Sequence, residues 1–152
     1  MFDRYVLDTC SIISYYDEEF IGANSSNKLT PSTKKIMFDS INEITDNVLV
    51  IPNVVFLEIY IKWFVSEEEK ERIRFNVFEP LKLSKNIEFK SISYDVLTEL
   101  VGILNSPFEC NFDNHDKQVL ASAIELNSKL ITSDNKLVSY VNKSKCIPEI
   151  IY

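Results

Sequence analysis

Short apolar runs alternate along this chain with longer stretches in which apolar positions recur at helical spacing. The apolar runs predict strands over 4–8, 47–52, 87–93 and 129–134, and a final edge strand within 147–152. The helical spacing predicts helices over 9–16, 31–45, 53–65, 67–75, 94–104, 115–127 and 135–141. Strands that alternate with helices in this way are typical of an α/β sandwich on a mostly parallel sheet.

The remaining stretches, the chain length and the hydrophobic content agree with a single globular domain. Residues 18–30 are polar around Gly22 and are predicted to form a loop, and Thr30 followed by Pro31 is typical of a helix start. The 152 residues have the size of one ordinary domain, and 45% hydrophobic residues are enough for a core, so residues 1–152 are expected to form one domain. No apolar run approaches the ~20 residues of a membrane span.

Composition excludes several classes of site. The two glycines, Gly22 and Gly102, cannot make a dinucleotide fingerprint or a P-loop. The one histidine, His115, excludes a two-histidine ribonuclease and a histidine-rich zinc site. Three widely spaced cysteines argue against a disulfide framework, and the first residues lack the pattern of a secretory signal, so we expect a cytoplasmic protein.

The net charge further restricts the functional classes to which this protein can belong. A protein that binds nucleic acid mainly through phosphates is usually basic, whereas this chain has a formal net charge of −7. The acidity disfavours a simple nucleic-acid-binding module. It remains compatible with an enzyme whose carboxylates surround metal ions, because the bound cations change the local field.

Four acids occur at the ends of predicted strands or near the starts of predicted helices. Asp8 and Asp134 each follow an apolar strand, Asp116 stands at the predicted start of the 115–127 helix, and Glu58 lies inside the apolar stretch VVFLEIYI. Ligands of open parallel sheets bind beyond the carboxyl ends of the strands, where the following helices begin. The four carboxylates are therefore expected to converge on one pocket.

Converging carboxylates repel one another and require cations. A set of oxygen ligands without a usable histidine or cysteine favours Mg²⁺ or Mn²⁺. Two such ions about 3.5–4 Å apart would clamp the attacking and leaving oxygens of a phosphodiester. The chemistry that fits is phosphodiester hydrolysis.

These segments together resemble the PIN-domain family of metal-dependent ribonucleases. YVLDTCSII resembles the family's first strand with its first acid, and IPNVVFLEIY resembles its helical glutamate motif. HDKQVLASAIELNSKLITSD resembles the last two motifs, an aspartate at the start of an alanine-rich helix and a strand that ends in Thr-x-Asp. On this match the acids are Asp8, Glu58, Asp116 and Asp134, and Thr9 and Thr132 are supporting hydroxyls.

The resemblance implies a three-layer α/β/α sandwich on a parallel sheet of about five strands. It also implies an endoribonuclease that uses Mg²⁺ or Mn²⁺ bound by Asp8, Glu58, Asp116 and Asp134, with RNA as its substrate. The size is similar to that of VapC-type toxins of toxin–antitoxin pairs, which implies an antitoxin partner and a homodimer.

Several residues have two interpretations. Lys117 departs from the family's usual small residue and either contacts a phosphate or is solvated. Asp113 is either a fifth carboxylate or a loop residue, and His115 is interpreted as a helix-start residue. The candidates for phosphate contacts are Lys34, Lys35, Lys62, Lys70, Arg72 and Arg74, and those for base stacking are Tyr15, Tyr16, Tyr60 and Trp63; ordinary helix surface or core is the alternative for each.

Two other functions fit these residues less well. A PIN-like module without catalysis, used for binding or scaffolding, is disfavoured by the presence of all four acids. A phosphatase of the aspartyl-phosphate type needs a second acid two residues after its nucleophile, whereas Asp8 is followed by Thr9 and Cys10.

Overall fold

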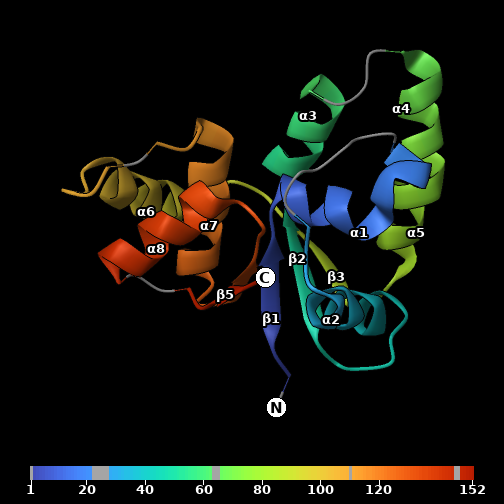
Figure 1. The fold of residues 1–152 in the computed structure, drawn as a ribbon, viewed down its shortest axis with the longest axis horizontal. Coiled ribbons are helices and arrows are strands. Elements are labelled where there is room, and N and C mark those ends of the chain that lie inside the picture. Colours follow the sequence, from blue (N-terminus) through green and yellow to red (C-terminus); the bar gives the residue numbers. More distant parts are fainter. Residues whose placement is uncertain (1, 22–27, 63–65, 110, 146–147) are drawn as a thin grey trace.

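The computed structural model describes residues 2–21, 28–62, 66–109, 111–145 and 148–152. Helices and strands alternate through these ranges (Figure 1). In chain order they are β1 (Arg4–Leu7), α1 (Thr9–Ile21), α2 (Pro31–Ile41), β2 (Val48–Pro52), α3 (Asn53–Lys62), α4 (Glu67–Ile73), the π-helix η1 (Arg74–Phe78), α5 (Glu79–Leu83), β3 (Ile87–Lys90), α6 (Tyr94–Leu104), α7 (Asn114–Glu125), β4 (Lys129–Ile131), α8 (Asn135–Ser144) and β5 (Ile150–Ile151). Gly22, Trp63, Cys110 and Cys146, which the sequence interpretation used, lie outside the described residues.

The five strands form one sheet in the order β3-β2-β1-β4-β5, and every neighbouring pair is parallel. Helices α6, α7 and α8 lie on one side of this sheet, and α1, α2, α4 and α5 lie on the other (Figure 1). The predicted three-layer α/β/α sandwich with about five parallel strands is confirmed, as is the edge position of the last strand.

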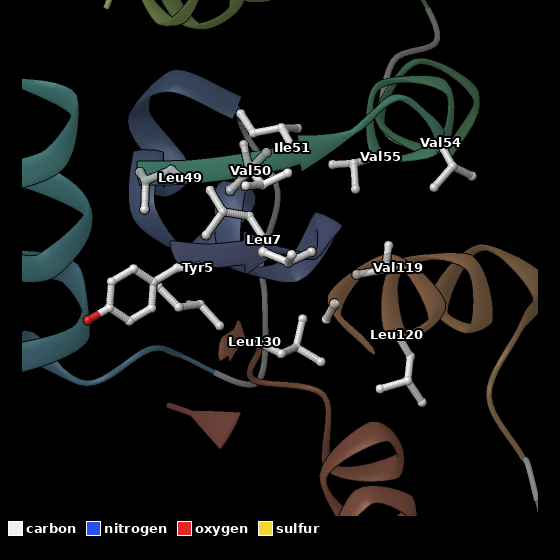
Figure 2. Packing of buried hydrophobic residues seen from close by; sticks show 14 of the residues in the cluster. Tyr5, Leu7, Leu49, Val50, Ile51, Val54, Val55, Val119, Leu120 and Leu130 are labelled. Atoms are coloured by element: carbon white, nitrogen blue, oxygen red, sulfur yellow. The ribbon is translucent and has the colours of Figure 1, made fainter. Parts of the chain in front are cut away.

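The two central strands are apolar because helices cover both of their faces. Val6, Leu7, Val50 and Ile51 are fully or almost fully buried. Figure 2 shows Leu7, Val50 and Ile51 in one core cluster with Leu130 of β4 and with side chains of α3 and α7 (Val54, Val55, Val119 and Leu120). The sheet is thus held rigidly at its centre, where β1 and β4 end next to each other.

Side-chain caps explain where three of the helices begin. Thr30 accepts a hydrogen bond from the Thr33 amide ahead of α2, and Ser93 accepts one from the Val96 amide ahead of α6. Ser66 and Glu69 form a reciprocal capping box at α4. The predicted 94–104 helix is confirmed at both ends.

Several predicted helix boundaries were wrong, including those of the 115–127 helix, which spans Asn114–Glu125, and of the 135–141 helix, which continues to Ser144. The helix predicted over 31–45 ends at Ile41, because Glu43 adopts a left-handed backbone with φ of 57° and turns the chain. The loop predicted over 18–30 begins later, because α1 continues to Ile21. The 67–75 helix ends at Ile73, and the chain then continues as η1 and α5.

The strands predicted to end at Asp8, Ser93 and Asp134 also stop earlier, at Leu7, Lys90 and Ile131. The residues after β1 and β4 therefore lie just beyond the carboxyl ends of these strands. No helix in the described ranges has the length and hydrophobicity that crossing a membrane requires.

Candidate metal centre

The carboxyl ends of β1 and β4 lie side by side at the centre of the sheet. Leu7 is paired in register with Ile131, and the Asp8 amide donates to the Ile131 carbonyl. The chain goes from β1 to β2 and β3 on one side, and later to β4 and β5 on the other. The β1/β4 boundary is therefore the topological switch point at which such sheets bind ligands.

Asp8 is buried directly beyond the end of β1, with 1% of its surface exposed. Its Oδ1 accepts a hydrogen bond from the Ser11 amide at 2.6 Å and another from the Ser11 hydroxyl. Its Oδ2 accepts one from the Thr132 hydroxyl across the switch point. Burial raises the pKa of Asp8 to about 6, against the opposing effect of these hydrogen bonds.

Glu58 reaches the same edge from α3, which begins directly after β2. It is 7% exposed, and the Thr9 hydroxyl donates a hydrogen bond to its Oε2. Thr9 and Thr132 thus each hold one of the predicted acids in position.

The start of α7 differs from the sequence prediction. Asp113, and not Asp116, caps this helix, because its Oδ1 accepts hydrogen bonds from the amides of His115 at 2.9 Å and Asp116 at 3.0 Å. Asp116 therefore lies in the first turn of α7, three residues after the capping residue Asp113. Its carboxylate is not the group that caps the helix.

Asp116 has a raised pKa to which the other acids of the site contribute. Burial raises its pKa to about 8, and the charges of Asp113, Glu58, Asp134 and Asp8 act in the same direction, in that order. The carboxylates from four separate segments therefore interact electrostatically at one place.

Asp134 is fixed between β4 and α8. Its carboxylate caps α8 by accepting a hydrogen bond from the Lys136 amide at 2.8 Å, and its own amide donates to the Thr132 hydroxyl at 3.0 Å. One hydroxyl, that of Thr132, thus connects the two acids that follow β1 and β4.

These groups surround a cavity of about 290 Å³. Glu58, Asp116 and Asp134 line it, whereas Asp8 is not among the lining residues. The complete lining is Thr9, Cys10, Glu58, Phe112, Asp113, Asp116, Asp134 and Lys136. Burial, together with the surrounding acids, raises the pKa of the Cys10 thiol.

One group of ligand atoms in the described residues has the spacing of a metal site. Glu58, Asp113 and His115 each place one ligand atom within 4.8 Å of the other two. No three of the four predicted acids meet that spacing. They share an acidic region without being pre-set around a single ion. Sequence interpretation gave Asp113 and His115 lesser roles, yet both lie beside this cavity.

Most of the other predicted RNA contacts have ordinary structural partners. Lys117 lies over the Phe112 ring, with its Nζ 5.9 Å from the ring centroid. Lys35 and Lys70 form ion pairs with acids of their own helices. Arg74 of η1 pairs with Glu71 of α4, and Tyr60 packs on Phe78. The side chain of Lys62, like Trp63, lies outside the described part of the chain. Lys136, which was not singled out from the sequence, is the cation that lines the cavity.

Comparison with known proteins shows structures of similar fold. No family model and no curated protein matches the sequence. The solved structures that match this chain include that of VapBC2 from Rickettsia felis, which is bound to a DNA fragment from its promoter. The alignment covers 98% of this chain and 97% of the matched chain at 15% identity, with a TM-score of 0.61.

The chain has a PIN-like fold. At this identity the similarity concerns the fold alone. The PIN-like arrangement agrees with the element order that the sequence resemblance implies, from the strand before Asp8 to the helix after Asp134.

Proposed function

We propose that this chain is a metal-dependent endoribonuclease that hydrolyses RNA phosphodiester bonds in the cytoplasm. The observation that supports it is the cavity at the β1/β4 switch point, lined by Glu58, Asp113, Asp116 and Asp134 with Asp8 behind them. So many carboxylates in one small space favour a bound cation. Their oxygen atoms suit Mg²⁺ or Mn²⁺.

In this proposal Asp8, Glu58, Asp116 and Asp134 hold Mg²⁺ or Mn²⁺, directly or through water. A bound ion would activate a water molecule and stabilise charge on the phosphate. Thr9 keeps the Glu58 carboxylate oriented, and Thr132 does the same for Asp8. Both roles follow from hydrogen bonds that are present without substrate.

The group of Glu58, Asp113 and His115 bears on which ion is preferred. Imidazole nitrogen is a better ligand for Mn²⁺ than for Mg²⁺. If this group forms one binding position, His115→Ala should weaken Mn²⁺ binding in titration calorimetry and leave the weaker Mg²⁺ binding nearly unchanged. Equal loss of both ions would argue that His115 supports the fold of the site and does not bind the metal.

Lys136 is proposed as the contact to the substrate phosphate. It is exposed at the second residue of α8 and lines the acidic cavity. Lys136→Ala should weaken binding of single-stranded RNA in EDTA and lower the slope of log affinity against log salt by about 1. An unchanged slope would remove Lys136 from the proposed substrate contacts.

The decisive experiment is cleavage of a mixed RNA pool by the purified protein in Mn²⁺, in Mg²⁺ and in EDTA. We expect cleavage only with metal, and its loss in Asp8→Asn and in Asp116→Asn. Asp46→Asn changes an exposed acid that does not line the cavity, and should cleave normally. Circular dichroism checks that the variants fold.

Full activity in both site variants would refute the assignment. A folded wild-type protein that binds metal and cleaves no RNA would favour the alternative, a PIN-like module that binds without catalysis.

We further propose that the chain is the toxin of a toxin–antitoxin pair and that it forms a homodimer. The VapBC2 structure, which is bound to a DNA fragment from its promoter, supports the toxin assignment through similarity of fold. A small protein encoded beside this chain should co-purify with it and suppress RNA cleavage. Cleavage that is unaffected by that protein at saturating concentration would contradict the pairing.

A further inference from the structure

Another cavity, of about 350 Å³, lies between α3, η1, α5 and β3, and we call it the aromatic pocket. Four aromatic rings line it, those of Phe56, Tyr60, Phe78 and Phe89. Between ring centroids, Phe56 lies 4.5 Å from Phe78 and 5.2 Å from Phe89. Tyr60 lies 5.4 Å from Phe78. Phe78 is 6% exposed and Phe89 is 37% exposed, so the rings extend from the core to the surface.

Two cations also line the aromatic pocket. Arg74 pairs with Glu71, and Lys82 pairs with Glu79, each at 3.2 Å. The members of both pairs are about half exposed, so each pair contributes little to stability. A phosphate group that approaches the pocket can therefore replace the acid as the partner of either cation.

Asn53 gives the aromatic pocket a group that can recognise the edge of a ligand. It is the first residue of α3, and its side-chain amide donates a hydrogen bond to the Ser91 hydroxyl at 3.2 Å. An amide offers both a donor and an acceptor, which suits the edge of a base. Aromatic rings and nearby cations are the features with which proteins hold unpaired bases and their phosphates. The volume is near the lower end of the roughly 300–1,000 Å³ of small-molecule sites, which suits a single base.

The aromatic pocket and the acidic cavity lie on opposite sides of α3. In Figure 1, α7 is on one side of α3, and α4 and α5 are on the other. Glu58 lines the acidic cavity, and by helix geometry Phe56 and Tyr60 lie about 160° around the axis from it. Both sites are at the carboxyl edge of the sheet, because α3 begins directly after β2.

The surface of α3 between the two sites is exposed and apolar. Leu57 and Ile61 are 53% and 65% exposed. By the same geometry, they lie between the Glu58 side and the Tyr60 side of the helix. A helix with its side chains is about 10–12 Å across. A single strand can therefore cross α3 over these side chains, with one phosphate at the acids and a base a few nucleotides away in the aromatic pocket.

We infer that the aromatic pocket holds one unpaired base of the RNA that the acidic centre cleaves, and that it contributes to the choice of cleavage site. This inference rests on the proposed nuclease function. The base stacks on the rings of Tyr60 and Phe89, and Asn53 contacts its edge. Arg74 and Lys82 contact the phosphates on either side of that base.

The charges favour RNA over a protein side chain as the occupant. Although the chain has a formal net charge of −7, this cavity is lined by two cations, Arg74 and Lys82, and one acid, Glu79. An apolar side chain of a protein would pack on the rings and leave both cations without a role. A base brings its own phosphates, which are complementary to these cations.

The first test is binding of short, fluorescently labelled homopolymers of uridine, adenosine and cytidine, measured by anisotropy in EDTA so that no strand is cleaved. Phe89→Ala removes an exposed ring and should weaken binding of at least one homopolymer by roughly tenfold. Phe89→Tyr keeps a ring and should bind nearly as the wild type does. Phe108→Ala is the matched control and should bind normally, since Phe108 is 40% exposed and lines neither the aromatic pocket nor the acidic cavity.

Three results of the binding test would overturn the inference. The first is unchanged binding by Phe89→Ala, or an equal loss in Phe108→Ala. The second is a wild-type chain that binds none of the homopolymers. The third is a Phe89→Ala chain that binds RNA normally but no longer binds a protein that co-purifies with the wild type, because the pocket would then belong to that protein.

The second test maps the cleavage sites in the mixed RNA pool with Mn²⁺. Phe89→Ala should lose the base preference at one position, at a fixed distance from the cut, and should raise KM, whereas its Mn²⁺ binding by calorimetry should match the wild type. The same base preference in both chains would overturn the inference and leave the nuclease intact. Ring-dependent RNA binding by a protein that cleaves nothing would refute the nuclease and keep the base-binding site.

Discussion

In the metal-free protein Asp116 keeps its proton at neutral pH, because its pKa is raised to about 8. In the unfolded chain that pKa returns to its ordinary value of 3.8. The folded state therefore binds this proton more tightly, and the free energy of unfolding falls as pH rises between these two values. Asn resembles the protonated acid and does not titrate. Asp116→Asn should therefore lose this part of the pH dependence and be more stable than the wild type at pH 8.

The magnitude follows from the pKa and from the position of the group. Each pKa unit corresponds to about 1.4 kcal/mol, but solvent screens a carboxyl group that is only partly buried. We therefore expect the advantage of Asp116→Asn to grow by on the order of 2 kcal/mol between pH 5 and pH 8. The free energy of unfolding of the variant should still fall slightly as pH rises, because the pKa of Asp8 is also raised, to about 6.

The assay is urea unfolding in EDTA at pH 5, 6, 7 and 8, with Asp46→Asn as the control at an exposed site. The control should follow the wild type at every pH. Saturating Mn²⁺ at pH 8 should then reverse the ranking, because it stabilises only the protein that binds it. If the wild-type and Asp116→Asn curves stay parallel from pH 5 to pH 8, the raised pKa of Asp116 is wrong.

Thr132→Val removes the hydroxyl that donates to Asp8, so the pKa of Asp8 should rise further. Urea unfolding should show a loss of about 1–3 kcal/mol at pH 8 and a smaller loss at pH 5; equal losses would contradict the role of the charged form. Asp113→Ala should lower the free energy of unfolding by about 1 kcal/mol through loss of the α7 cap. Asp113→Asn should restore the cap but still bind Mn²⁺ more weakly by calorimetry, and full Mn²⁺ affinity would exclude this carboxylate as a ligand. Leu130→Ala in the buried β4 should cost about 2–5 kcal/mol in urea unfolding, whereas Leu83→Ala should cost little, and similar costs would contradict the packing of β4.

Much of the fold could be predicted because burial on both faces of a parallel sheet gives uninterrupted apolar runs. The runs before Asp8 and Pro52 are of this kind and mark β1 and β2. The end of the 31–45 helix could not be predicted, because it depends on Glu43 in a left-handed conformation that also lets its carboxylate bind the Lys85 amide. That contact joins residues far apart in the sequence.

The site likewise contains some residues whose positions the sequence predicted and others whose roles it did not. The positions of Asp8 and Asp134 follow from the rule that ligands bind beyond the ends of parallel strands. The cap at Asp113 had a local signal, since an acid followed three residues later by Asp116 resembles a capping box. The exposed residues Leu97, Val101 and Leu104 of α6 are apolar and recur at helical spacing, as core residues do, so the sequence alone could not distinguish them from the core.

The order of the strands also has a consequence for how the protein is made. β1 is the first strand to be synthesised, but it pairs with β4, and the residues around the cavity extend from Thr9 to Lys136. A ribosome-bound chain that has not yet released β4 has no partner for that side of β1, so Thr132 cannot hold Asp8. The acidic centre can therefore assemble only when nearly the whole chain has emerged.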